Sequence, residues 1–177
     1  MLDIATGYNK YKFLGNDFLT WLWFIIENEI NIKELINSEH KIISFQIGNS
    51  IVLENMLGDK LKEKISIKGD EAGLEEGKTA LKKGAVVTSI NLILNIDEEE
   101  YKFSIKGESL NITGFKTPSF KSENNKDDIE GAILEKAFFC EKIYNLIDLL
   151  FNKFMEKRSS EAFKNKDIHE IRKWIKN

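Results

Sequence analysis

The densest run of hydrophobic positions lies near the start of the chain, in residues 13–28. Eight of the nine residues from 18 to 26 are apolar or aromatic, and two of the three tryptophans are among them. Phe18, Leu22 and Ile25 recur at helical spacing, with aromatic residues on the other faces. A helix that is apolar all round is either buried or spans a membrane, and this run is too short to cross a bilayer that needs roughly twenty residues. The pattern predicts a central buried helix, with Asn16 as its N-cap.

The middle of the chain changes to a period of two. Alternating apolar residues predict strands over residues 41–47, 50–53, 61–68, 86–96 and 101–106, with a last short strand around Leu110 and Ile112. Gly48 and Asn49 form a typical turn dipeptide, so we expect a hairpin there. Residues 29–39 predict a second amphipathic helix, and residues 70–83 a short helix that ends at Gly84. Residues 114–126 contain the single proline and indicate a loop.

The helical period returns from residue 127 and continues for about thirty residues. Its apolar positions step alternately by four and three, which predicts a long helix with a broad core-facing stripe: Ile133, Ala137, Cys140, Tyr144, Ile147, Phe151 and Phe154. A last helix follows Ser159 and Ser160. The predicted fold class is α+β, an antiparallel β-meander of about five or six strands packed by an N-terminal aromatic helix and long C-terminal helices. We expect an α+β domain over residues 1–120 and a helical region over 121–177, packed as a single compact unit.

Composition adds few restrictions. The chain has 177 residues and a net charge of −3, which argues against a strongly basic nucleic-acid binder. The only cysteine, Cys140, lies in the helical stripe, where we expect a small buried hydrophobe, and no disulfide framework is possible. No secretion signal or membrane span is visible, so a cytoplasmic protein is expected.

Candidate catalytic groups are sparse. His40 and His169 have no partner at a useful spacing, and no glycine-rich phosphate loop follows a strand. Residues 97–100 are four consecutive acids, which could hold Mg²⁺ for phosphodiester cleavage or simply form a solvated hairpin tip. The hairpin tip is favoured because alternate side chains of a strand point apart. We therefore predict no catalytic residue, no metal site and no cofactor.

The positive charge is concentrated at the C-terminal end. Residues 153–177 contain eight lysines and arginines but only four acids. A row of cations on a helix can bind phosphates without reading sequence, although an ordinary solvated helix face has a similar composition. The candidate DNA contacts are Lys153, Lys157, Arg158, Lys164, Lys166, Arg172, Lys173 and Lys176.

Several motifs resemble those of the RdgC family of bacterial recombination-associated proteins. The run Phe13-Leu-Gly-Asn-Asp-Phe-Leu-Thr-Trp-Leu-Trp-Phe is similar to the family's LGxxFLxWLW signature. Three further stretches agree in order: the Leu-Glu-Glu-Gly-Lys-Thr-Ala-Leu-Lys-Lys-Gly segment of residues 74–84, the Ile-Thr-Gly-Phe-Lys-Thr-Pro segment of residues 112–118, and the C-terminal helices from Ile133 to Ile175. The match covers most of this chain but only the C-terminal part of full-length members.

The resemblance implies a nucleoid-associated protein that binds double-stranded DNA without sequence preference and restrains a recombinase. Full-length members form a ring-shaped dimer with a basic hole, whereas this chain is shorter and acidic overall. We expect a homo-oligomer or an assembly with a related family subunit. The alternatives are a protein-interaction subunit whose partner contacts DNA, and a metal-dependent nuclease that uses residues 97–100.

Overall fold

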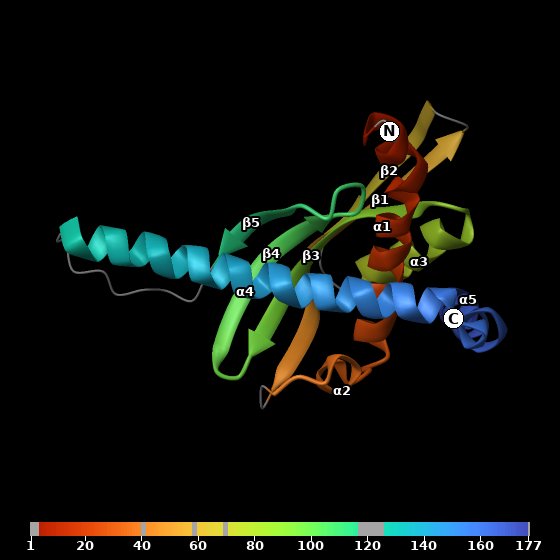
Figure 1. Ribbon diagram of the computed structural model, residues 1–177. Helices are drawn as coiled ribbons and strands as arrows, with labels where there is room; N and C mark the ends of the chain where they lie inside the picture. Colours follow the sequence, from red (N-terminus) through yellow and green to blue (C-terminus); the bar gives the residue numbers. More distant parts are fainter. Residues whose placement is uncertain (1–3, 40–41, 58–59, 69–70, 117–125, 177) are drawn as a thin grey trace.

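The sheet and helices of the computed structural model confirm the predicted α+β class (Figure 1). The structure describes residues 4–39, 42–57, 60–68, 71–116 and 126–176. Five antiparallel strands form one sheet in the order β2-β1-β3-β4-β5. The elements are α1 (Ile4–Glu27), α2 (Ile32–Ile36), β1 (Ile43–Leu57), β2 (Lys60–Ile67), α3 (Glu71–Lys82), β3 (Val86–Ile96), β4 (Glu99–Lys106), β5 (Ile112–Lys116), α4 (Lys126–Ser159), the π-helix η1 (Phe163–Asp167) and α5 (Ile168–Lys176).

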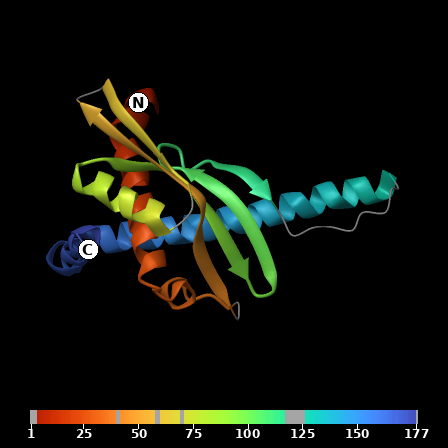
Figure 2. The same ribbon diagram turned by 180° about the vertical axis from the view of Figure 1, so that it is seen from behind.

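The sheet has helices α1 and α4 on one face. Viewed from behind, the strands lie in front of both helices (Figure 2). Residues that alternate along the central strands are buried on the helix side, as in Leu92 and Leu94 of β3 and Phe103 of β4. The intervening Asn91 and Ser104 are only partly buried. This alternation is typical of an antiparallel sheet with one covered face.

Strand β1 is continuous through the predicted hairpin at Gly48 and Asn49, so that prediction is wrong. The two halves of β1 both pair with β3, and the register shifts between Ile47 and Ile51. Asn91 Oδ1 accepts a hydrogen bond from the Asn49 backbone N–H at 3.0 Å. A Cβ on Gly48 would lie 2.0 Å from that same oxygen. The glycine therefore makes room for a cross-strand side chain at an irregular point of the ladder.

Helix α1 confirms the central aromatic helix but not its predicted start. It begins at Ile4, so Asn16 lies within the helix and is not its N-cap. Gly15 is buried against Gly107 at the end of β4, where an added Cβ would lie 1.7 Å from the Gly107 carbonyl oxygen. The glycine thus allows the helix backbone to contact the sheet directly.

The core lies between α1, the sheet and the second half of α4. Phe18, Leu22 and Trp23 of α1 have no exposed surface. Phe18 packs edge-on against Phe151 of α4 with a ring separation of 5.4 Å, and Trp21 lies 5.5 Å from Phe154. Aromatic pairs at these separations add to the stabilisation from burial.

Helix α4 is buried along only part of the predicted stripe. Ile147 and Phe154 are buried, but Ile133 is 62% exposed and Tyr144 is 44% exposed. Cys140 is half-buried, not buried as predicted. The cause is visible in Figure 1, where the first half of α4 extends past the sheet. Among the described residues, no helix combines the length and apolarity that crossing a membrane requires.

Candidate nucleic-acid interface

The eight candidate cations fall into two groups. Lys153, Lys157 and Arg158 lie near the end of α4, whereas Lys164 and Lys166 are on η1, and Arg172, Lys173 and Lys176 are on α5. Helix α4 ends at Ser159, after which the Ser160 hydroxyl accepts a hydrogen bond from the Phe163 N–H at 3.2 Å. This turn redirects the chain, so the two groups belong to different helix axes.

The α4 group is largely engaged within the protein. Lys153 forms an ion pair with Glu156 at 2.8 Å, and Arg158 pairs with Asp17 of α1 at the same distance. The Arg158 guanidinium also lies over the rings of Phe13 and Phe154, with separations of 5.7 and 5.9 Å. Burial raises the pKa of Asp17, and the nearby Arg158 charge only partly offsets this effect. Arg158 therefore joins α4 to α1.

The α5 group occupies one exposed helix face. Trp174 is buried on the opposite face, and only 7% of its surface is exposed. Arg172, Lys173 and Lys176 are all exposed, and within the described part of the chain none has an acidic group within 4 Å. Lys166 is weakly paired with Glu170 at 3.9 Å. The exposed face of α5 is therefore mainly basic.

A lysine from α3 joins this face. Lys82 Nζ donates a hydrogen bond to the backbone carbonyl of Lys176 at 2.8 Å. We name Lys82, Arg172, Lys173 and Lys176 the basic corner. Lys83 is on another flank of α3, where it lines a hollow of about 390 Å³ together with acidic residues. The sequence alone does not place Lys82 beside α5, because the two contacting residues are 94 positions apart.

A single carboxylate fixes α5 in this position. Glu27, the last residue of α1, accepts hydrogen bonds from the indole N–H groups of Trp23 at 2.7 Å and Trp174 at 2.8 Å. Its Oε2 atom also pairs with Lys78 of α3 at 3.1 Å. Trp23 and Trp174 meet edge to face with a ring separation of 5.3 Å. We name these four residues the Glu27 cluster, and it connects α1, α3 and α5.

The Glu27 cluster also affects protonation. Burial alone lowers the pKa of Lys78, but the hydrogen bond to Glu27, the Glu27 charge and the smaller effects of Glu75 together outweigh burial, so the pKa is raised. The only sequence signal for this cluster was the spacing of Trp23 and Glu27 by one helical turn. That spacing cannot reveal Lys78 or Trp174, which come from distant segments.

The acidic run at residues 97–100 does not converge on one point. Asp97 lies in the turn after β3 and accepts a hydrogen bond from the Ile42 N–H at 3.1 Å. Glu99 accepts one from the Tyr101 hydroxyl at 2.5 Å, and Glu100 pairs with Lys102 at 3.0 Å. Burial, followed by the hydrogen bond to Glu99 and the charge of that residue, raises the pKa of Tyr101. Across the residues that the structure describes, no three His, Cys, Asp or Glu side chains group as a metal site would require.

The other candidate groups are dispersed. His169 is exposed on α5, while His40 lies outside the described residues. Lys164 is exposed on η1.

A scan against models of known protein families finds no match for this chain, and a search of curated proteins also finds none.

Proposed function

We propose that this protein binds double-stranded DNA without sequence preference through the basic corner. The observation that carries the proposal is the contact between Lys82 and Lys176, which brings cations from α3 and α5 to one exposed surface. This surface belongs to a chain whose net charge is −3. The motifs similar to the RdgC family favour a role in recombination, in which the bound protein would restrain a recombinase on the duplex.

The chemistry of the basic corner fits phosphate recognition better than base reading. Ammonium and guanidinium groups on a convex helix surface can contact the DNA backbone and release condensed counterions. Reading bases requires side chains aligned with the edges in a groove, usually from a recognition element that enters it. The basic corner instead offers cations on the outer surface of a terminal helix. Binding should therefore be independent of sequence and sensitive to salt.

A set of charge-neutralising substitutions tests the proposal. The corner variant combines Lys82→Gln, Arg172→Gln and Lys173→Gln. The matched control combines Lys106→Gln, Lys116→Gln and Lys136→Gln, which removes the same charge from exposed positions elsewhere. Anisotropy of a fluorescent 30-base-pair duplex at about 50 mM salt should show at least about tenfold weaker binding for the corner variant and less than about threefold for the control. Equal losses in the two variants would refute the proposed surface.

A second candidate is a protein-interaction subunit whose partner supplies the DNA contacts. The exposed apolar side chains of α4 favour it, because large exposed apolar patches commonly mark protein interfaces. In that case the purified chain should retain no duplex, and the corner substitutions should have no effect on DNA binding by the assembled complex. Binding by the purified chain that the corner substitutions weaken would exclude this alternative.

A further inference from the structure

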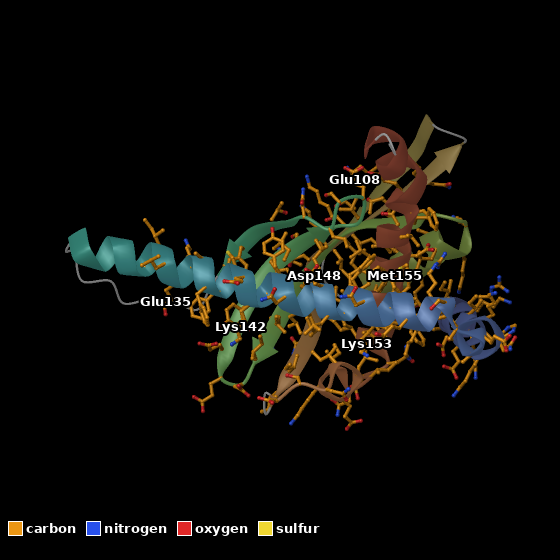
Figure 3. The ribbon with its side chains drawn as sticks, in the orientation of Figure 1. Glu108, Glu135, Lys142, Asp148, Lys153 and Met155 are labelled. Atoms are coloured by element: carbon orange, nitrogen blue, oxygen red, sulfur yellow. The ribbon has the colours of Figure 1, made fainter. Side chains whose placement is uncertain are left out.

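A hollow of about 410 Å³ lies where the end of β4 meets α1. Its described lining residues come from α1, from strands β1 to β4 and from the connection between β4 and β5. Figure 3 shows one of them, Glu108, on this connection beside α1. Pockets for small molecules typically measure about 300–1,000 Å³, so the hollow is large enough for a small ligand. None of the basic-corner residues is among the described lining residues.

The register of the sheet brings an apolar floor and a cation to this hollow. Val52 of β1 lies opposite Ser89 of β3, and Ser89 lies opposite Lys106 of β4. In the next row, Glu54 of β1 lies opposite Val86 of β3. Residues that face each other across antiparallel strands have their side chains close together on one face of the sheet. The hollow therefore has two half-buried valines beside a hydroxyl and an ammonium group.

Helix α1 adds a carboxamide whose orientation is fixed. Asn16 Oδ1 is buried and has no hydrogen-bond partner among the described residues. This oxygen lies against the backbone of Gly107, where an added Cβ would be 2.3 Å from it. A buried acceptor without a donor is unusual and requires an explanation. Because the two ends of a carboxamide point apart, the buried oxygen leaves the Nδ2 donor of Asn16 facing the hollow.

One cation and one anion of the hollow have no internal partner. Lys106 and Glu108 are both exposed, and within the described part of the chain neither forms an ion pair. They flank Gly107, whose backbone N–H donates a hydrogen bond to a carbonyl of β3 at 2.8 Å, so the backbone between the two charges is fixed. The other two charged side chains of the lining, Glu54 and Lys64, pair with each other at 3.4 Å. The hollow therefore offers one ammonium and one carboxylate to a ligand.

We propose that this hollow binds a small zwitterion, namely an α-amino acid with an apolar side chain. The ligand carboxylate accepts hydrogen bonds from the Lys106 ammonium and from Asn16 Nδ2. The ligand ammonium donates to the Glu108 carboxylate, and its apolar side chain lies on Val52 and Val86. Each polar contact of this arrangement includes at least one charged group, and hydrogen bonds of this kind are stronger than those between neutral groups.

The lining favours a zwitterion over other small ligands. A simple anion such as inorganic phosphate would bind Lys106 but would be repelled by Glu108, and a simple cation would meet the reverse problem. No aromatic side chain is among the described lining residues, so a nucleobase has no ring to stack on. A ligand that carries both charges satisfies both free groups of the hollow.

This inference does not depend on the proposed DNA binding. Lys106 is one of the three lysines that the control for the duplex experiment replaces. Lys106→Gln should therefore lose amino-acid binding while duplex binding is retained, and the corner variant should show the opposite pattern. The two proposals can thus fail separately.

Titration of the ¹⁵N-labelled full chain, followed by NMR, tests the ligand class. L-leucine should bind with a dissociation constant below about 1 mM and shift the amide signals of Asn16 and Ser89. N-acetyl-L-leucine lacks the ammonium and L-leucinamide lacks the carboxylate, so each should bind at least about tenfold more weakly. A dissociation constant above about 1 mM for L-leucine would overturn the inference, as would equal affinity for all three compounds or tighter binding of inorganic phosphate.

Two substitutions test which residue holds which end of the ligand. Lys106→Gln should weaken binding of L-leucine at least about tenfold and leave L-leucinamide unaffected, because that compound has no carboxylate to lose. Glu108→Gln should weaken L-leucine to the same extent and leave N-acetyl-L-leucine unaffected. The controls Lys116→Gln and Glu98→Gln remove the same charges from exposed positions outside the described lining. Equal affinities for L-leucine in these variants and their controls would contradict the assignment.

Discussion

Replacement of Glu27 by alanine is expected to weaken the packing of α5 against α1 and α3. The side chains of Glu27 and Lys78 are only 18% and 13% exposed, and the indole of Trp23 is fully buried. Glu27→Ala leaves two indole N–H donors without their acceptor, and it leaves Lys78 paired only with the exposed Glu75. A hydrogen bond to a charged acceptor is worth about 1.5–3 kcal/mol, so losing both indole bonds should cost about 3–6 kcal/mol. That cost is a large part of the 5–15 kcal/mol that typically stabilises a domain.

Urea denaturation followed by tryptophan fluorescence measures the effect. With a slope of about 2 kcal/mol/M, Glu27→Ala should lower the midpoint by about 2 M. Glu27→Gln retains the shape and one acceptor oxygen, so its cost should be about 2 kcal/mol. Glu75→Ala is the matched control, because Glu75 also pairs with Lys78, at 3.4 Å, but its side chain is 65% exposed. An exposed pair contributes less than about 1 kcal/mol.

The difference in unfolding free energy between Glu27→Ala and Glu75→Ala tests whether the Glu27 cluster holds α5 in place. If Glu27→Ala lowers the unfolding free energy no more than Glu75→Ala, the Glu27 cluster does not hold α5 against α1 and α3.

The same variants also test how the Glu27 cluster affects duplex binding. Because Glu27 positions Trp174, and Trp174 lies on α5 beside the basic corner, Glu27→Ala should also weaken duplex binding under conditions where the protein is still folded.

Three further predictions concern the fold. Gly15→Ala should lower the unfolding free energy by at least about 3 kcal/mol in urea titrations, because the new Cβ would clash with the Gly107 carbonyl. The control Gly131→Ala lies at an exposed helical position with open space, and it should raise the unfolding free energy by up to about 1 kcal/mol. The folded-state pKa of Lys78 is raised, so its charge contributes fully to stability below its unfolded-state pKa of 10.5. That contribution is lost as the pH rises through the folded-state pKa. The difference in unfolding free energy between wild type and Lys78→Met should therefore be constant near neutral pH and should shrink above pH 10.5. Asn91→Ala should cost about 2 kcal/mol in thermal unfolding, because the side chain bonds to both neighbouring strands, and an unchanged midpoint would refute this role.

The elements with a single strong period could be predicted from the sequence. The bounds of β3 match the predicted residues 86–96, because its buried residues alternate from Ile90 to Ile96 and both neighbouring strands pair with it. The burial of Phe18 and Leu22 follows in the same way from the apolar run. In these elements, local pattern and tertiary environment favour the same structure.

Features that depend on contacts between distant segments could not be predicted. Gly48 has the local signature of a turn, but the side chain of Asn91 on β3 determines the structure there. The apolar stripe of α4 does not reveal where the sheet ends, so burial of Ile133 was expected and its exposure is found. The eight candidate cations were equivalent in sequence. Only the folded chain separates Arg158, which pairs with Asp17, from those that join Lys82.

The salt dependence of duplex binding tests the central claim most directly. A plot of the logarithm of the association constant against the logarithm of salt concentration should be linear, with a slope of about −3 to −4 if most of the four basic-corner cations contact phosphates. The corner variant should make the slope shallower, between about −1 and zero, and the matched control should leave the slope unchanged. An absence of duplex binding at about 50 mM salt, or a slope that the corner substitutions do not alter, would contradict the account.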